Sequence, residues 1–202
     1  MAIDVTVPSE EVLSSDGRHR RRVVNRDRVI HATLDLFADG TLTPTVADVA
    51  ARAEVSERSV FRYFADVDDL IFSAMAHAAG HVTEDLQETR PAVGSLDERI
   101  VKYCTVRIEL FREISPVAQA ARAWASGTPA ILEPINEVRT CVEAQTDRFF
   151  GEEFAHLGVE GPAVRAAVEA VTSIDALAAL GASRPDDEIV EMMSVALRKL
   201  LS

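Results

Sequence analysis

The stretch "TVADVAARAEVSERSVFRYF", which runs from Thr45 to Phe64, decides the fold of the N-terminal region. After Thr45, apolar side chains recur at helical spacing, and Asp48 follows three residues later, as in a capping box. A second helix is predicted to begin after Ser56, because serine is a preferred N-cap residue. Only a short turn can separate these two helices, so the stretch predicts a helix-turn-helix.

Helices are also predicted on both sides of this stretch. One runs from about Asn25 to Asp39, with Gly40 suited to its C-terminal cap, and Asp66 is a suitable N-cap for another that ends near Thr89. Further helices are predicted over residues 96–114, 116–126, 129–156, 162–181 and 186–201. No alternating apolar run favours a strand. The sequence therefore predicts an all-α fold, with a three-helix helix-turn-helix domain followed by a C-terminal helical domain.

The net charge of the 202-residue chain is −12, but it is unevenly distributed. Residues 18–64 contain nine arginines and six acidic residues, whereas residues 65–202 contain 12 basic and 23 acidic residues. A basic segment beside an acidic remainder is typical of a small domain that meets DNA phosphates. The run "RHRRR" at 18–22 is either a solvated charge run or a basic arm that contacts DNA, and its position favours the arm.

Several classes of protein are not expected from this sequence. No apolar run reaches the roughly 18 residues that suggest a membrane span, and the N-terminus lacks the apolar core of a signal peptide. We therefore expect a cytoplasmic protein without a membrane partner. No nucleophile elbow, phosphate-binding loop, HExxH motif or dinucleotide-binding turn occurs, so an enzyme is not expected. Cys104 and Cys141 match no metal or redox motif and are expected to be reduced and buried.

The N-terminal motifs resemble those of the tetracycline-repressor (TetR) family of bacterial one-component regulators. The resemblance spans about Arg26 to Ile71 and rests on "LDLFADG", "TVADVAARAEV", "SERSVFRYF" and "ADVDDLI". It implies a repressor that binds a palindromic operator in double-stranded DNA as a homodimer and is released by a small-molecule effector. An alternative is a helix-turn-helix protein controlled by a partner protein, or under no effector control.

Three positions depart from the family pattern. Glu54 stands where glycine is common in the turn, Phe61 where tyrosine is frequent, and Val67 where a lysine often starts the fourth helix. Glu54 is expected to strain the turn. The other two changes remove a phosphate donor and a cation, so DNA binding is expected to depend more on residues 18–22.

The DNA contacts are predicted mainly from the third helix. Arg58 on its first turn suits a guanine edge, Ser59 a base or a phosphate, and Phe61 a thymine methyl group. Side chains later in the helix, together with the basic arm and the cap of the second helix, are predicted to contact the backbone. The predicted DNA-binding residues are Arg20, Arg21, Arg22, Thr45, Arg58, Ser59, Phe61, Arg62 and Tyr63.

Three segments are predicted from these patterns: a disordered extension with a basic arm (1–22), the helix-turn-helix domain (23–66), and a ligand-binding and dimerisation domain (67–202). Apolar side chains cover more of the last two helices than one core needs, which favours a four-helix dimer interface over a monomer with an unusually broad core. The predicted interface residues are Val164, Val168, Val171, Ile174, Ile189, Met193, Leu197 and Leu200.

The effector pocket is predicted less directly, because aromatic side chains at helical spacing also occur in ordinary cores. The candidate lining residues are His77, His81, Tyr103, Arg107, Phe111, Trp124 and Phe149, with Cys104 and Arg122 as further polar candidates. His77 and His81 stand four residues apart and could hold a zinc ion with Glu84 or Asp85. Such a pair on a helix is usually incidental, so no metal or other cofactor is expected.

Overall fold

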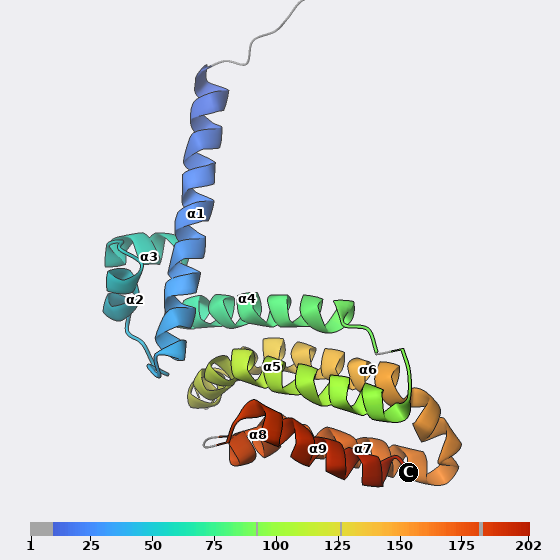
Figure 1. Ribbon diagram of the computed structural model, residues 1–202. Coiled ribbons are helices and arrows are strands. Elements are labelled where there is room, and N and C mark those ends of the chain that lie inside the picture. Colours follow the sequence, from blue (N-terminus) through green and yellow to red (C-terminus); the bar gives the residue numbers. More distant parts are fainter. Residues whose placement is uncertain (1–9, 92, 126, 182–183) are drawn as a thin grey trace, which may run out of the picture. The chain divides into compact units, whose positions relative to one another are not determined.

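A computed structural model describes residues 10–91, 93–125, 127–181 and 184–202, and within these ranges every regular element is a helix (Figure 1). The predicted all-α fold is confirmed. In chain order the α-helices are α1 (Glu10–Ala38), α2 (Val46–Arg52), α3 (Glu57–Tyr63), α4 (Val67–Glu88), α5 (Leu96–Trp124), α6 (Glu133–His156), α7 (Gly161–Val171), α8 (Ile174–Gly181) and α9 (Asp186–Leu200). Short 3₁₀ helices at Pro129–Leu132 and Gly158–Glu160 precede α6 and α7. No helix in the described ranges is long and apolar enough to cross a membrane.

The chain divides into two compact units, Met1–Ala74 and Met75–Ser202. The division falls inside α4, whereas the sequence predicted a boundary at residue 66. Helix α1 begins at Glu10, well before the predicted start near Asn25, and so includes most of the segment for which disorder was predicted. Arginine and glutamate favour helix and Gly17 is the only strong helix breaker there, so the helix can extend toward the N-terminus. Residues 1–9 lie outside the described residues.

The N-terminal unit is built as the capping signals predicted. The Thr45 hydroxyl accepts a hydrogen bond from the Asp48 N–H, and the Asp48 carboxylate accepts one from the Thr45 N–H, which completes a capping box at α2. The Ser56 hydroxyl accepts from the Ser59 N–H at the start of α3. Gly40 ends α1 with φ at +87°. Helices α1, α2, α3 and the first turns of α4 enclose a core that includes Val29, Ile30, Leu36, Val49, Val60, Phe64 and Leu70.

The turn between α2 and α3 has a left-handed residue at Glu54, whose φ is +55°. The Val55 N–H donates to the Ala50 carbonyl (3.0 Å) and the Glu54 N–H to the Ala51 carbonyl (3.3 Å). This pair of bonds is a Schellman motif, in which the left-handed position usually belongs to glycine. The expectation that Glu54 occupies a position suited to glycine agrees with this geometry.

The C-terminal unit differs from the prediction at two helix boundaries. A break was predicted before Pro116, but α5 runs through it to Trp124. A proline inside a helix removes one hydrogen bond, yet Ile114 and Ala118 on either side are buried, and this packing holds the helix together. Conversely, the single helix predicted over 162–181 is divided after Val171. The Ser173 hydroxyl there accepts from the Ala176 N–H (3.2 Å), as an N-cap does, and starts α8.

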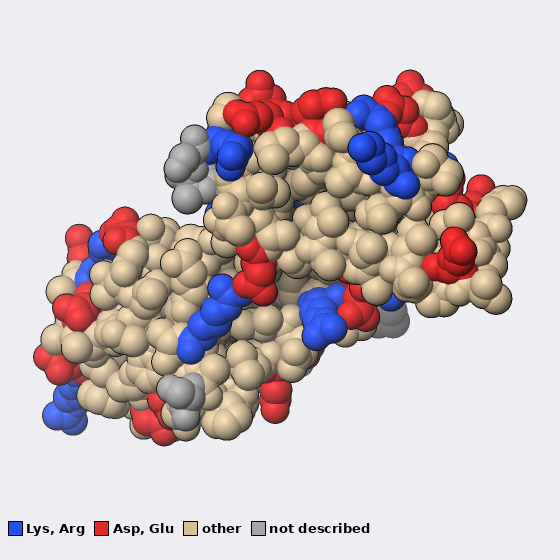
Figure 2. Space-filling model, turned by 90° about the horizontal axis from the view of Figure 1, so that it is seen from below, with Lys and Arg blue, Asp and Glu red and all other residues tan. Residues whose placement is uncertain are grey.

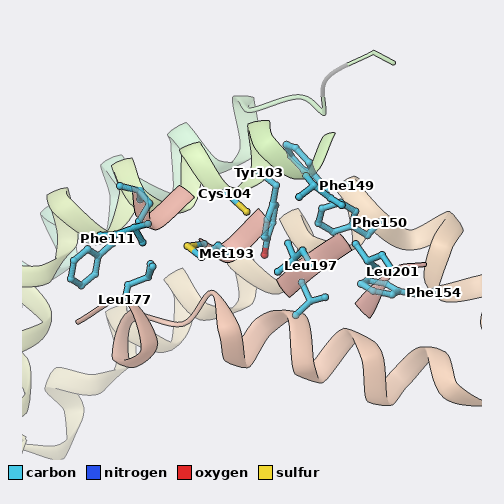
Figure 3. Close-up of a cluster of buried hydrophobic side chains, with 14 residues drawn as sticks. Tyr103, Cys104, Phe111, Phe149, Phe150, Phe154, Leu177, Met193, Leu197 and Leu201 are labelled. Carbon is cyan, nitrogen blue, oxygen red and sulfur yellow. The ribbon is translucent and has the colours of Figure 1, made fainter. Parts of the chain in front are cut away.

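The core of the C-terminal unit lies mainly between α5, α6, α7 and α9 (Figures 1 and 3). Helix α9 packs along α5, and α7 packs along α6. Tyr103 stands in the middle of this core, with its ring centroid 5.3 Å from that of Phe149 and 5.0 Å from that of Phe150. Its hydroxyl is 2.8 Å from the Thr146 hydroxyl, so the one polar atom of this buried ring has a partner.

Candidate functional site

Helix α3 presents one face to the core and the other to solvent. Val60 and Tyr63 are buried, whereas Arg58, Phe61 and Arg62 are exposed. The Phe61 side chain is 53% exposed, which is unusual for so large an apolar group. A helix with this surface can enter the major groove with its charged and aromatic side chains leading. The structure thus places three of the predicted DNA-binding residues on one accessible face.

Several arginines of the N-terminal unit differ in their pairing. Arg28 and Arg52 each form an ion pair with a carboxylate of the same unit. Among the residues that the structure describes, no carboxylate lies within ion-pair distance of Arg22, Arg58 or Arg62. These three cations are therefore available for phosphate or base edges. The side chains of Arg20 and Arg21 lie outside the described residues.

Tyr63 has a different place from the one predicted for it. Its ring is 9% exposed and belongs to the N-terminal core, and its hydroxyl accepts a hydrogen bond from Arg62 Nη2 at 2.6 Å. Burial alone would raise the pKa of this hydroxyl, but hydrogen bonds from Arg62 and Asn25 and the charges of Arg62 and Arg22 outweigh it and lower the pKa. Tyr63 thus holds Arg62 in place at the edge of the core and brings only its hydroxyl near the surface.

Thr45 and Ser59 both use their hydroxyl groups within the motif. The Thr45 hydroxyl donates to Asp48 Oδ2 at 2.6 Å, and this bond, with the one from the Thr45 N–H, lowers the pKa of Asp48. The Ser59 hydroxyl lies 2.9 Å from that of Ser56, and Ser59 is half-buried. Thr45 is exposed, so its position still permits a phosphate contact. Ser59 is less accessible than Arg58.

The C-terminal unit holds a cavity of about 510 Å³ lined by α4, α5, α6, α7 and α8, together with Ser173. Most of its wall is aliphatic, with Leu110, Ile114, Val138, Val142 and Ile174 among the lining residues. Six charged side chains also line it, namely Arg107, Arg122, Arg139, Glu143, Glu169 and Asp175. Its size and its largely apolar wall are those of a small-molecule site.

Of the predicted pocket residues that the structure describes, Arg107 and Arg122 line this cavity. Tyr103, Phe111 and Phe149 belong instead to the packed core of the C-terminal unit (Figure 3). These three side chains lie outside the cavity wall, and the helical spacing did not reveal this because core and pocket side chains share it. His77, His81 and Trp124 do not line the cavity either, and the two histidine rings pack edge to face with centroids 4.7 Å apart.

Sequence reasoning missed most of the polar wall. Arg139, Glu143, Glu169 and Asp175 line the cavity but were not predicted, since each is one charged residue among many on a helix surface. The sequence does indicate an unusual position for Arg107, because this arginine lies between Val106 and Ile108 and interrupts an apolar stretch.

Arg107 is almost completely buried, with 4% of its surface exposed. Its Nη2 donates to the Thr172 carbonyl at 2.9 Å, at the C-terminal end of α7, and its guanidinium lies 5.9 Å from the centroid of the Tyr103 ring. Burial lowers the pKa of Arg107, partly opposed by the groups around it, Tyr103 first and then Glu169. A helix C-terminus is a favourable place for a cation, so this contact offsets part of the desolvation.

Four of the predicted dimer residues lie inside the chain. Val168, Ile189, Met193 and Leu197 are buried in the C-terminal core, so they have almost no surface to offer a partner. The breadth of the apolar stripe on α9 has a different cause, because one side of it packs against α5. Val164, Val171, Ile174 and Leu200 are half-buried at the edge of this core. The large exposed apolar residues of α9 are Met192 (40%) and Val195 (43%).

The described residues contain no group of three His, Cys, Asp or Glu side chains arranged to hold a metal ion.

Cys104 is a buried free thiol, and burial raises its pKa to about 11 despite a hydrogen bond with Ser194. Cys141 is also free but only half-buried, whereas the sequence predicted both to be buried.

Residues 29–74 match the family model described as bacterial regulatory proteins, tetR family. This range contains the end of α1, all of α2 and α3, and the start of α4, which together form the N-terminal core. In this region the chain is similar to bacterial regulatory proteins of the tetR family.

The curated relatives of this chain are described as transcriptional regulators, a class of proteins that are not enzymes. An HTH-type transcriptional repressor of Mycobacterium tuberculosis and an HTH-type transcriptional regulator of Mycobacterium bovis are each 27% identical over 112 residues. The aligned part covers 55% of this chain and 57% of each relative, so the chain spans little more than half the length of the curated relatives it matches.

Solved structures resemble this chain over most of its length. A transcriptional regulator from Rhodococcus sp. Rha1 has a TM-score of 0.69 at 19% identity, over 87% of this chain and 95% of its own. A transcriptional regulator from Streptomyces coelicolor has a TM-score of 0.65 at 20% identity, over 88% and 98%. The multidrug binding protein EbrR, complexed with ethidium, has a TM-score of 0.63 at 22% identity, over 88% and 99%. At these identities the likeness establishes the fold.

Proposed function

We propose that this chain is a TetR-family repressor that binds a palindromic operator as a homodimer and is released from it by a small-molecule effector. The observation that carries the proposal is the exposed face of α3. There Arg58 and Arg62 have no carboxylate partner among the described residues, and Phe61 exposes its ring. The N-terminal unit is then the DNA-binding domain, and the C-terminal unit binds the effector and forms the dimer. Such a protein acts in the cytoplasm.

The two arginines of α3 have different tasks in this proposal. Arg58 lies on the first turn, where a recognition helix meets base edges, and its free guanidinium suits the O6 and N7 atoms of guanine. Arg62 lies one turn later and is held by the Tyr63 hydroxyl, which suits a fixed contact with a phosphate. Phe61 lies between them in sequence and can contact a thymine methyl group. Arg22, near the Tyr63 hydroxyl, adds a second cation for the backbone.

The proposed dimer surface is the exposed side of α9, with α8 beside it. Met192 and Val195 are exposed there, and Val190, Ala196 and Leu200 are half-buried. Figure 2, which looks from the side on which α8 and α9 lie in Figure 1, shows scattered charges with wide uncharged areas between them. Two copies that join α8 and α9 across a two-fold axis would cover this apolar surface.

The cavity of the C-terminal unit is the proposed effector site. Its volume and largely aliphatic wall are suited to a small organic molecule. EbrR, a protein of similar fold, has been solved with ethidium, which supports a small-molecule role for this chain. The effector acts in this account by favouring a state of the dimer that binds the operator less tightly.

In vitro selection from a pool of random double-stranded DNA tests the DNA-binding part of the proposal. The purified chain is expected to enrich a palindrome with two half-sites about one helical turn apart, or a multiple of it. The triple variant with alanine at Arg58, Phe61 and Arg62 is the control and is expected to enrich nothing. A parent protein that enriches no sequence, or enriches a single half-site without symmetry, would contradict the proposal.

A further inference from the structure

The buried guanidinium of Arg107 has hydrogen-bond donors that the described chain does not satisfy. Its Nη2 donates to the Thr172 carbonyl, but its Nε and Nη1 have no partner among the described residues. A buried charged donor without an acceptor is unfavourable, because it has lost water and gained nothing in exchange. Arg107 lines the cavity, so an acceptor can reach these donors from there.

The other two arginines of the cavity wall pair with carboxylates of the same wall. Arg122 lies 2.5 Å from Asp175, and Arg139 lies 3.2 Å from Glu143. The remaining carboxylate of the wall, Glu169, lies 3.0 Å from Arg165, an arginine that also pairs with Asp147. The buried Oε1 atom of Glu169 has no hydrogen-bond partner among the described residues, and burial raises the pKa of this carboxyl.

Arg107, in contrast, has no carboxylate within ion-pair distance anywhere in the described ranges. Arg107 is therefore the arginine of the described cavity wall that no carboxylate contacts directly, although the charge of Glu169 acts on it. Arginine keeps its proton even in buried sites, so this charge persists.

The rest of the wall is apolar. Leu110, Ile114, Val138, Val142 and Ile174 surround a volume of about 510 Å³ in which a hydrocarbon body would be removed from water. A ligand that satisfies both features has a hydrophobic body and a single anionic head.

We propose that the effector is a hydrophobic anion, a carboxylate or a phosphate ester, whose head group accepts hydrogen bonds from Arg107. The proposal rests on the effector role of this cavity proposed above. Charge-assisted bonds from an arginine to an anion are among the strongest that a site can offer, and they are strongest where water is excluded. A hydrophobic cation would instead meet the charge of Arg107, while Asp175 and Glu143 already pair with arginines of the wall.

Calorimetric titration of the full-length protein with matched probes tests this assignment. The probes are decanoate, decyl phosphate, neutral 1-decanol and cationic decyltrimethylammonium, which share one chain and differ in the head. We expect saturable binding of decanoate or decyl phosphate, at least about tenfold tighter than that of 1-decanol, because hydrogen bonds to charged groups are worth more than neutral ones. Equal binding of the neutral probe, tighter binding of the cation, or no saturable binding of either anion would overturn the proposal.

Substitution then assigns the effect to Arg107. Arg107→Gln should weaken binding of the anionic probe by about tenfold to a hundredfold and leave binding of 1-decanol unchanged. Arg112→Gln is the matched control, since this arginine lies on the same helix as Arg107 but pairs with Asp186 and does not line the cavity, and it should bind the anion nearly as the parent does. An Arg107→Gln protein that binds the anion as tightly as the parent would also overturn the proposal. If Arg107→Gln fails to fold, the comparison of the four probes in the parent protein decides alone.

A failure of the anionic-effector proposal can be distinguished from a failure of the repressor proposal. Binding to the selected operator is measured on the same preparations by fluorescence anisotropy. An intact operator complex that only neutral or cationic compounds release would refute the anionic effector and leave the repressor proposal standing.

Discussion

At the scale of single residues, Glu54 makes the turn of the helix-turn-helix less stable than a glycine would. The sequence predicted strain at this position. Glu54 occupies a left-handed conformation, in which a Cβ atom is disfavoured by roughly 1–2 kcal/mol. Its ion pair with Arg28, at 3.4 Å, is too exposed to offset much of this. The turn is therefore held by the two helices that pack on either side of it.

Replacing Glu54 should reveal this cost. Glu54→Gly is expected to raise the free energy of unfolding by about 0.5–1 kcal/mol, because glycine accepts a positive φ while gaining some entropy in the unfolded chain. Glu54→Ala keeps the Cβ atom and loses only the ion pair, so it should stay within about 0.5 kcal/mol of the parent. Urea unfolding followed by circular dichroism measures both. Equal gains for glycine and alanine would mean that the carboxylate, not the backbone, is the cause.

Two arginines of α3 provide a second test at this scale. Arg58→Ala should weaken binding to the selected operator by about 1–3 kcal/mol and relax the preference at one base pair of each half-site. Arg62→Ala should weaken all sequences alike and lower the salt dependence of binding by about one charge per chain. Anisotropy titrations at several salt concentrations on operator and unrelated DNA separate the two.

Tyr63→Phe links the second of these effects to its structural cause. This variant keeps the buried ring but loses the hydroxyl that holds Arg62, so it should show part of the Arg62→Ala effect on every sequence. Identical behaviour of the Arg58 and Arg62 variants would contradict the division between base and phosphate contacts.

At the scale of elements, the N-terminal helices were predictable and two boundaries in the C-terminal unit were not. Helices α2 and α3 begin where Thr45 and Ser56 indicated, because a cap acts through bonds within three residues of itself. Pro116 is an equally local signal, but burial of the side chains on both sides of it outweighs one lost hydrogen bond. The break after Val171 depends on Ser173 acting as a cap within an apolar segment, and the helical period gave no sign of it.

The prediction at the scale of elements is that the exposed side of α9 forms the dimer surface. Val195→Glu should place a charge in the proposed dimer surface and shift the protein toward monomers, because an unpaired buried carboxylate is costly. Val159→Glu is the matched control, since Val159 is fully exposed on the 3₁₀ helix before α7 and should leave assembly unchanged. Sedimentation velocity measures the assembly, and circular dichroism checks that each variant is folded. Dimers of equal stability in both variants would move the interface away from α9.

At the scale of the whole molecule, the sequence predicted an effector pocket by resemblance and a dimer surface from the apolar breadth of its last two helices. Of the described residues that line the cavity, it named Arg107 and Arg122. Tyr103, Phe111 and Phe149 repeat at helical spacing whether they line a core or a cavity, and only the packing of α5 against its neighbours distinguishes the two. The same holds for Met193 and Leu197 on α9, which pack inside the chain. A charged residue within an apolar stretch was more informative than aromatic spacing, because Arg107 is such a residue and it lines the cavity.

Coupling between effector and operator is a property of the whole molecule as well. If decanoate or decyl phosphate binds as proposed, saturating it should weaken operator binding, by a coupling free energy of about 1–3 kcal/mol. Linkage requires that operator DNA weaken binding of the same anion by the same factor. Calorimetry with and without operator, and anisotropy with and without the anion, measure the two factors. Unchanged operator affinity at saturating anion would contradict the coupling, and unequal factors would show that one titration had not reached equilibrium.

The central claim, that two chains read one palindrome through α3, is tested most directly by the mass of the DNA complex. Sedimentation equilibrium of the parent protein on the selected operator should give two chains per duplex, and a duplex with only one half-site should bind at least about tenfold more weakly, since each arginine–guanine contact contributes about 1–3 kcal/mol. One chain per duplex, or equal affinity for the half-site and the full palindrome, would contradict the account.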